Sequence, residues 1–401
     1  MKNSWHNTYL MIALLIFSHM LIFCMDSIIY FVIGSIRSDL ELSDTQARLV
    51  YGASIFGMAV MSIPIGYLLR TANRKWVAVA GLLVSSLATI ATAFCHSFEA
   101  IFIARLTMGF GLALNTLATL AIGLSYFSRY RTNVIAIEQF SAGVGLVLGL
   151  NIGVILGETL EWRETSTILT SAGLLTAAAL SLCLKPWLSQ ARANINLQVQ
   201  HTHNTLSKTI WSKRPIMLGA ITVLISLAYF SYPVMFASYL QEKGDFTWQA
   251  GEMTVSLFAA GNLFALYGPS LVKKFGAKTL LLRVLLLTAA LSTLLFTNFG
   301  YSTTLQVIFS VYLGMAISVT LVTLSSEMVN AVIPSQSTPA IGLFTACLCA
   351  PIIVPAPLMR AIQEIAGWDV AGMVSISASL LLATLITSQL QKEQYLSARH
   401  H

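Results

Sequence analysis

Charged residues are scarce in this sequence. Only 10% of its 401 residues are Asp, Glu, Lys or Arg, and 56% are hydrophobic, whereas soluble domains contain roughly 25% charged residues. A soluble domain has too little interior to bury so much apolar surface. Apolar segments follow one another with no polar domain between them. The sequence therefore predicts an integral membrane protein whose solvent is largely lipid.

Several motifs that carry chemistry are also missing. No glycine-rich stretch ends in Gly-Lys-Ser/Thr, and neither His-Glu-x-x-His nor Gly-x-Ser-x-Gly occurs. No repeated filter loop of the kind that channels use is present. Five cysteines lie in apolar segments without a disulfide or metal-binding pattern: Cys24, Cys95, Cys183, Cys347 and Cys349. We expect no metal, no cofactor and no catalytic residues.

Twelve segments are long and apolar enough to cross a bilayer as helices, which takes roughly 20 residues each. Helices are expected because lipid offers no hydrogen-bond partner to unpaired backbone groups. The first segment is too long for the apolar core of a signal peptide. The predicted spans are residues 9–36, 46–69, 76–96, 98–126, 133–158, 164–184, 215–240, 249–272, 278–298, 303–330, 339–361 and 368–390.

Charges in the connections alternate along the chain. One set of loops is basic, with Arg70, Arg74, Lys75, Arg129, Arg131, Lys185, Arg192, Lys208, Lys213, Arg214, Lys273, Lys274 and Lys278. The other set is acidic, with Asp39, Glu41, Asp44, Glu99, Glu158, Glu161, Glu164, Glu242, Asp245, Glu364 and Asp369. Lys and Arg stay on the cytoplasmic side, so both termini are expected there. The rule accounts for the net charge of +7 without a nucleic acid partner.

The two halves of the chain resemble each other at an offset of a little over 200 residues. The segment from Gly66 to Lys75 matches the segment from Gly268 to Lys278, and Trp162 at the start of the sixth span matches Trp368. A duplicated six-helix unit is typical of secondary transporters. We expect an all-α membrane protein with twelve transmembrane helices in two pseudo-symmetric bundles: residues 1–184 and 215–401, joined by a cytoplasmic linker, residues 185–214.

These features resemble the major facilitator superfamily over nearly the whole chain. Gly66, Arg74 and Lys75 match the family's mark between the second and third spans, although Arg70 stands in the place of its acid. The fourth span carries Arg105 followed by Gly109-Phe-Gly111, which is similar to the family's Arg and Gly-x-Gly pattern. The resemblance implies a central cavity between two bundles that rock between inward-open and outward-open states.

Asp26 is the strongest functional signal because it lies in an unbroken apolar segment. A charge near the bilayer centre costs about 2.5–3.5 kcal/mol on insertion scales, so it is rarely kept without a role. Arg105 is expected at a similar depth and could pair with Asp26, either as a proton-coupling device or as a static salt bridge. Glu138, about a turn and a half into the fifth span, is a second candidate proton site unless it reaches water at the membrane surface.

Other polar and aromatic side chains in the spans are candidates for the substrate cavity. His19 and Tyr30 fall on the same helical stripe as Asp26. The mid-span amides either line the cavity or bond a neighbouring helix, and the aromatic residues of the seventh span either face substrate or only pack. The candidates are His19, Tyr30, Asn115, Asn151, Tyr232 and Asn262.

Glycines and prolines are expected to serve packing and gating. Gly145, Gly149 and Gly153 form a ridge of small residues in the fifth span that lets another helix approach closely. Leu150 occupies the place of the proline in the antiporter signature of the superfamily. Pro351 and Pro355 are expected to interrupt the eleventh span.

The sequence thus predicts a secondary transporter driven by a proton gradient, a multi-pass monomer in a cell membrane, with a bacterial inner membrane expected. With Asp26 and Glu138 against Arg105, the expected cavity is net acidic and suits protons with a small neutral or cationic solute. Export of a partly apolar compound is the leading expectation. Proton symport of a nutrient is the alternative, with a non-transporting membrane enzyme or a channel further behind.

Overall fold

The structure is a computed structural model that describes residues 2–190, 206–244, 256–296 and 303–399. The described residues form helices and no strand, apart from an isolated bridge between Ser207 and Val332. The prediction of an all-helical membrane fold is therefore confirmed. The chain divides into two compact units, Met1–Asn204 with Ser337–Ala346, and Thr205–Gln336 with Cys347–His401. We call them unit 1 and unit 2.

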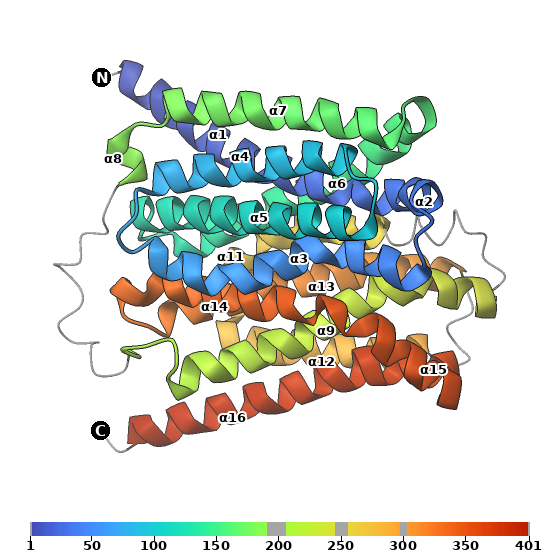
Figure 1. Ribbon diagram of the computed structural model, residues 1–401. Helices are drawn as coiled ribbons and strands as arrows, with labels where there is room; N and C mark the ends of the chain where they lie inside the picture. The colour runs from blue at the N-terminus through green and yellow to red at the C-terminus, as the bar shows by residue number, and fades with distance from the viewer. Residues whose placement is uncertain (1, 191–205, 245–255, 297–302, 400–401) are drawn as a thin grey trace. The chain divides into compact units, whose positions relative to one another are not determined.

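Unit 1 contains eight helices of the N-terminal half within its described residues, coloured blue to green in Figure 1. They are α1 (Lys2–Ser27), α2 (Ile29–Asp39), α3 (Asp44–Leu68), α4 (Arg74–Ala93), α5 (Phe98–Tyr126), α6 (Arg131–Thr159), α7 (Trp162–Cys183) and the short α8 (Pro186–Ser189). The predicted first span is not one helix, because a break at Ile28 separates α1 from α2.

The C-terminal half is more interrupted. Its described elements are α9 (Lys213–Gly244), η2 (Asn262–Tyr267), α11 (Gly268–Phe275), α12 (Ala277–Leu295), α13 (Thr303–Asn330), η4 (Pro334–Gln336), α14 (Ser337–Cys349), η5 (Ala350–Ile353), α15 (Pro355–Gly372), the π-helical η6 (Met373–Ala378) and α16 (Ser379–Arg399). Pro351 lies in η5, the irregular turn between α14 and α15, and Pro355 begins α15. Gly367, with φ of 82°, kinks α15 between the predicted eleventh and twelfth spans.

Eleven described helical segments are long and apolar enough to cross a membrane, and each corresponds to one of the twelve predicted spans. The remaining predicted span, residues 249–272, lies partly outside the described residues, and its described part continues as η2 and α11. The predicted cytoplasmic linker, residues 185–214, also lies partly outside them, so its role stays a prediction.

The same helix pairings occur in both units. In unit 1, α3 and α4 pack on α5, α4 packs on α7, and α1 packs on α6 and α7. In unit 2, η2 and α12 pack on α13, α12 packs on α16, and α9 packs on α15 and α16. Glycines make equivalent crossings: Gly109 of α5 lies against the backbone of Ser54, and Gly314 of α13 lies against that of Phe258. This agreement supports the internal repeat inferred from sequence.

Side chains cap the N-termini of α3, α4 and α5. The Ser43 hydroxyl accepts from the Gln46 amide, and Gln46 reciprocates at the Ser43 N–H, forming a capping box at the start of α3. Asn73 and Ser97 accept from the first-turn amides of α4 and α5. These caps satisfy backbone donors that the first helical turn leaves free.

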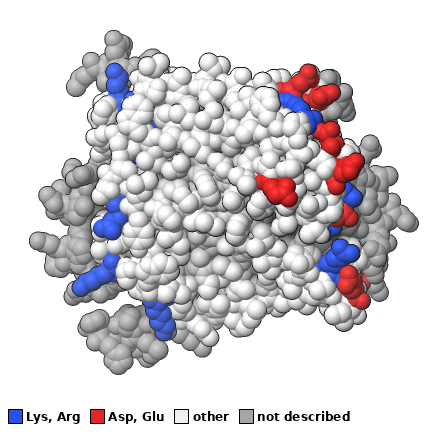
Figure 2. Space-filling view, viewed as in Figure 1, with Lys and Arg blue, Asp and Glu red and all other residues white. Residues whose placement is uncertain are grey.

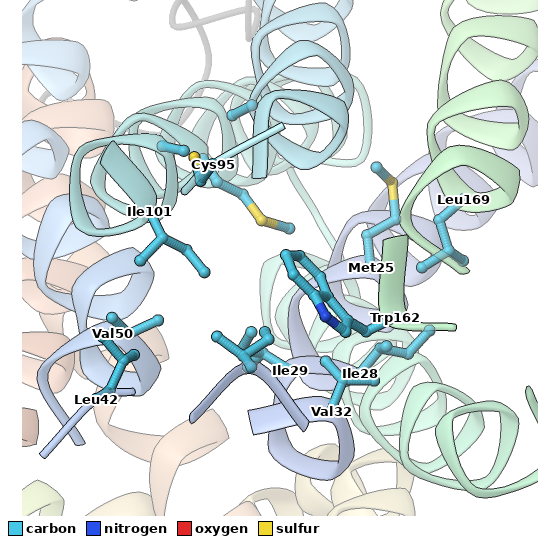
Figure 3. Packing of buried hydrophobic residues seen from close by; sticks show 14 of the residues in the cluster. Met25, Ile28, Ile29, Val32, Leu42, Val50, Cys95, Ile101, Trp162 and Leu169 are labelled. Atoms are coloured by element: carbon cyan, nitrogen blue, oxygen red, sulfur yellow. The ribbon is translucent and has the colours of Figure 1, made fainter. Parts of the chain in front are cut away.

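A hydrophobic cluster near the acidic end of unit 1 joins α1, α2, α3, α5 and α7. Trp162, at the first position of α7, is buried among Met25, Ile28 and Ile29, with Ile101 and Leu169 nearby (Figure 3). Burial of such side chains contributes roughly 1.5–3 kcal/mol each. The break between α1 and α2 lies inside this cluster, which fixes the backbone just beyond Asp26.

Charges separate to the two ends of unit 1. On the face that Figure 2 shows, acidic side chains gather near α2 and the start of α7, and basic ones gather at the α3–α4 connection. Arg37, Arg48 and Arg163 also lie towards the acidic end, where Arg37 pairs with Asp44 and Arg163 Nη1 lies 2.5 Å from Asp39 Oδ2. Two of these three cations are therefore neutralised locally.

Candidate functional site

Asp26 and Arg105 form a buried ion pair within unit 1. Arg105 Nη2 donates to Asp26 Oδ1 at 2.6 Å and to the Ser54 hydroxyl at 3.0 Å. Arg105 is 3% exposed and Asp26 is 8% exposed. The structure thus brings together α1, α3 and α5 through one guanidinium. A buried pair of this kind offsets much of the cost of removing each charge from water.

The end of α1 shapes this pair. Asp26 stands one residue before the end of α1, and its backbone carbonyl accepts a longer hydrogen bond of 3.4 Å from Arg105 Nη2. A cation at a helix C-terminus also interacts favourably with the helix dipole. The Arg105 Nη1 atom contacts Met108 Sδ at 3.0 Å, while Nε is buried without a hydrogen-bond partner in the described part of the chain. The guanidinium is thus incompletely satisfied.

A second buried polar cluster lies around Glu138. His19 Nε2 is 3.4 Å from Glu138 Oε1, and His19 Nδ1 is 2.7 Å from the Ser141 hydroxyl. The Thr119 hydroxyl lies 3.2 Å from Glu138 Oε1. His19 comes from α1, Thr119 from α5, and the other two from α6. The Glu138 side chain is 11% exposed and lies beside that of His19, which is 3% exposed.

These side chains line a largely apolar cavity within unit 1. Aliphatic and aromatic residues of α1, α5, α6 and α8 form most of its lining, including Ile12, Ile122, Tyr126, Phe127 and Leu188. Tyr126 ends α5 and α6 begins at Arg131. The cavity therefore lies on the part of unit 1 that carries the basic connections.

The three amide candidates differ in their surroundings. Asn115 is fully buried and donates to the Ala78 carbonyl of α4 at 3.2 Å, so it bonds a neighbouring helix. Asn151 is exposed in unit 1 and donates to the Val147 carbonyl of its own helix at 2.7 Å. Of the two alternatives for Asn151, the hydrogen bond that the structure shows is to its own helix and not to a neighbour, and a role in the substrate cavity stays a prediction. Asn262 is buried in unit 2 and donates to the Ala259 carbonyl at 3.2 Å.

The aromatic candidates make packing contacts. Tyr30 is half-buried, with its ring centroid 5.9 Å from that of Tyr51. Tyr232 is completely buried in unit 2, where its hydroxyl bonds that of Ser310 and its ring lies 4.9 Å from the ring of Phe258. Tyr232 therefore serves the core of unit 2 in this structure.

The glycine ridge of α6 lies against α1. A Cβ at Gly145 would meet the Met20 carbonyl, and one at Gly149 would meet the Cys24 carbonyl and the Ser27 hydroxyl. Gly153 is buried. Gly66 of α3 lies against the backbone of Thr338, which unit 1 also contains. These contacts hold the helices that carry Asp26 and Glu138 close together.

Arg74 and Lys75 lie at the start of α4. Arg74 Nη1 donates to the Ser125 hydroxyl at 2.7 Å and the Ala121 carbonyl at 3.2 Å, so it joins the start of α4 to the end of α5. Lys75 Nζ lies 5.3 Å from the Trp76 ring centroid. Arg70, which stands where the superfamily has an acid, is exposed.

Sequence reasoning missed the hydroxyl partners of both clusters: Ser54, Thr119 and Ser141. Each is a common small residue in an apolar helix, and neither type nor spacing separates it from the many other serines and threonines of the spans. The available signal was position, because Ser141 lies three residues after Glu138 and so shares its helix face.

A polytopic helical protein made of two units with the same helix pairings, and with a buried ion pair inside one of them, is a secondary transporter by its architecture. The model of the Major Facilitator Superfamily matches residues 15–356. The chain belongs to that superfamily. It is a multi-pass membrane transporter and not an enzyme.

One solved structure with a similar fold is a bacterial homologue of the human lysosomal transporter Spinster, in an inward-facing and unoccupied conformation. The TM-score is 0.63 and the sequence identity is 17%, over 98% of this chain and 97% of that chain. At this identity the likeness shows the fold alone.

Proposed function

We propose that this transporter exports a small, partly apolar compound in exchange for protons, and that Asp26 is the proton-exchanging group. The observation that carries the proposal is the 2.6 Å contact between Arg105 Nη2 and Asp26 Oδ1 inside the apolar bundle. A carboxylate in this position is stable while it is paired, and protonation is the alternative way to remove its charge. The cation and the proton therefore compete for the same carboxylate.

This competition supplies a coupling step. When Arg105 contacts Asp26, the carboxylate keeps its negative charge without a proton. When a conformational change draws the guanidinium away, the carboxylate takes up a proton from whichever side is open. Ser54 and the Asp26 carbonyl remain as partners for a displaced guanidinium, because Arg105 already contacts both. Asp26 thus carries a proton during one half of the transport cycle.

The charge balance supports a neutral or cationic solute. The acidic and basic side chains of these two clusters are Asp26, Glu138 and Arg105, together with His19. Recognition of phosphate or a dicarboxylate would call for more Arg or Lys. We further propose that the protein acts as a monomer in a bacterial inner membrane, and the loop charges support a cytoplasmic position for both termini.

Proteoliposomes provide the test. A thermal-shift panel of cationic, neutral and anionic compounds first identifies a ligand, because binding raises stability by mass action. Transport of that ligand is then followed with an imposed pH gradient and without one. Asp26→Asn should abolish gradient-driven accumulation while leaving downhill exchange in place. Asp44→Asn, which removes a carboxylate from an exposed ion pair with Arg37, is the matched control and should transport normally.

The same measurement also decides the direction of transport. Accumulation against the proton gradient supports export, whereas accumulation along it supports proton symport of a nutrient. If Asp26→Asn kept full gradient-driven transport, Asp26 would not be the coupling group.

A further inference from the structure

We infer that His19 and Glu138 form a second proton-binding site, which holds one proton between Nε2 and Oε1 and exchanges it through the apolar cavity of unit 1. The inference deepens the proposed function and rests on it for the role of this proton in transport. The site itself follows from counting the hydrogens around four side chains.

The count begins with Ser141. Its hydroxyl donates to the backbone carbonyl of Glu138 at 2.8 Å. A hydroxyl has a single proton to donate, so towards His19 it acts as the acceptor. His19 Nδ1, 2.7 Å away, must therefore carry a hydrogen. In a neutral imidazole the other ring nitrogen, Nε2, is then an acceptor.

Nε2 faces a second acceptor. Glu138 Oε1 lies 3.4 Å from it, and Nε2 is buried without another hydrogen-bond partner among the described residues. Two lone pairs facing each other in an apolar interior are unfavourable, and one added proton removes the conflict. The pair is then either a carboxylic acid with a neutral imidazole or a carboxylate with an imidazolium. Both forms are neutral overall.

Thr119 fits this arrangement. Its hydroxyl lies within 3.0 Å of the Asn115 and Thr116 carbonyls of its own helix, which can accept its proton, and 3.2 Å from Glu138 Oε1. Because a hydroxyl has one proton, Thr119 donates either to its own helix or to Glu138 Oε1, and in neither case does it supply the proton shared by Nε2 and Oε1. The hydroxyls of Ser141 and Thr119 thus hold the side chains of His19 and Glu138 in place, without supplying the proton between Nε2 and Oε1.

Loss of the proton would leave one negative charge beside the cavity. The other charged or titratable groups on the surrounding elements are Lys2, His6, Tyr9, Cys24 and Asp26 on α1, Glu99, Arg105 and Tyr126 on α5, Arg131 and Glu158 on α6, and Lys185 before α8. Asp26 and Arg105 neutralise each other. Arg131 precedes Glu138 by two helical turns, roughly 10 Å, and its Nε is buried without a partner in the described residues.

Arg131, at the start of α6 and on the same helix as Glu138, is the cation that stabilises the deprotonated pair. The proton leaves from Glu138 or from His19 Nε2 to water entering the cavity, and returns by the same route. Asp26 lies seven residues after His19, roughly 10 Å further along α1. The two proton sites thus lie at different depths of one helix.

The test uses purified protein and needs no substrate. Infrared spectroscopy detects the C=O stretch of a protonated carboxyl, and nitrogen-15 magnetic resonance of histidine-labelled protein detects an imidazolium. Near neutral pH, wild type should show one of the two signals, and raising the pH should remove it. Glu138→Gln should abolish the pH-dependent signal, and His19→Gln should shift the pH at which the carboxyl signal disappears. Asp26→Asn and the exposed-carboxyl control Glu99→Gln should leave the Glu138 signal in place.

An ionised Glu138 together with a neutral His19 at neutral pH would overturn the inference, because the pair would then hold no shared proton. Thr119→Ser, which keeps the hydroxyl, should behave as wild type and confirms that the fold tolerates change at the cluster. Since Asp26→Asn is scored by transport and Glu138→Gln by spectroscopy, failure of this site and failure of the proposed coupling give different results.

Discussion

Arg105 of α5 reaches Asp26 of α1 with a 2.6 Å hydrogen bond, and both side chains are buried in unit 1. Removing one partner leaves the other as an isolated ion in an apolar bundle, which costs about 3–5 kcal/mol in comparable buried pairs. Arg105→Ala should therefore lower the thermal midpoint in detergent more than Asp26→Asn, which leaves a neutral amide that can still accept from Arg105.

The double variant Asp26→Asn/Arg105→Ala provides the control. It contains no isolated charge, so its loss of stability should be smaller than the sum of the two single losses, as a double-mutant cycle measures. Additive losses would mean that the two side chains do not interact energetically.

The packing of α6 on α1 gives a second prediction. A methyl group at Gly145 would overlap the Met20 carbonyl and press on Phe23, whereas one at Gly34 of α2 would meet nothing within 4 Å. Gly145→Ala should cost about 1–3 kcal/mol through overpacking. Gly34→Ala should be neutral or stabilise by up to about 1 kcal/mol through helix propensity. Thermal unfolding and size-exclusion behaviour in detergent measure both, and equal stability of the two variants would contradict the close contact.

Part of this fold and site could be predicted from sequence, because apolar length and charge are strong signals. Eleven predicted spans correspond to described helices, and the positions of Asp26 and Arg105 in apolar segments were enough to suggest a pair at similar depth. The break at Ile28 could not be predicted, since neither glycine nor proline marks it. Ile28 lies in the hydrophobic cluster around Trp162, which is built from distant segments.

The pairing of His19 with Glu138 could not be predicted either. α1 is apolar on nearly every side, so hydrophobic periodicity does not fix which of its faces meets α6. The sequence placed His19 with Asp26 on one stripe, whereas tertiary packing turns His19 towards Ser141 and Glu138. Separations of more than one hundred residues leave no local signal for such contacts.

The role of Asn115 gives a third prediction. Its amide donates to the Ala78 carbonyl of α4 and it is fully buried, whereas Asn151 is exposed and bonds its own helix. Asn115→Ala should destabilise the protein by about 0.5–1.5 kcal/mol, the net value of one hydrogen bond. Asn151→Ala should change stability by less than about 0.5 kcal/mol, as surface substitutions usually do.

Ligand affinity distinguishes a packing role of Asn115 from a role in substrate binding. If Asn115 serves only to join α4 and α5, a compound found by thermal shift should bind Asn115→Ala with unchanged affinity once the variant is folded. A tenfold loss of affinity would instead return Asn115 to the substrate site.

The last prediction concerns membrane orientation, which the loop charges alone now support. Ser38, beside Asp39, and Ser128, beside Arg129, are both exposed and belong to opposite sets of connections. In intact cells an impermeant thiol reagent should label Ser38→Cys and spare Ser128→Cys, and permeabilised cells should allow both to react. Wild type is the control, because Cys95 lies in the α4–α5 connection on the acidic side. Burial raises the pKa of the Cys95 thiol. Since the thiolate is the reactive form, Cys95 should react slowly at neutral pH. Labelling of Ser128→Cys from outside in intact cells would reverse the orientation and, with it, the side from which the cavity beside Glu138 receives its proton.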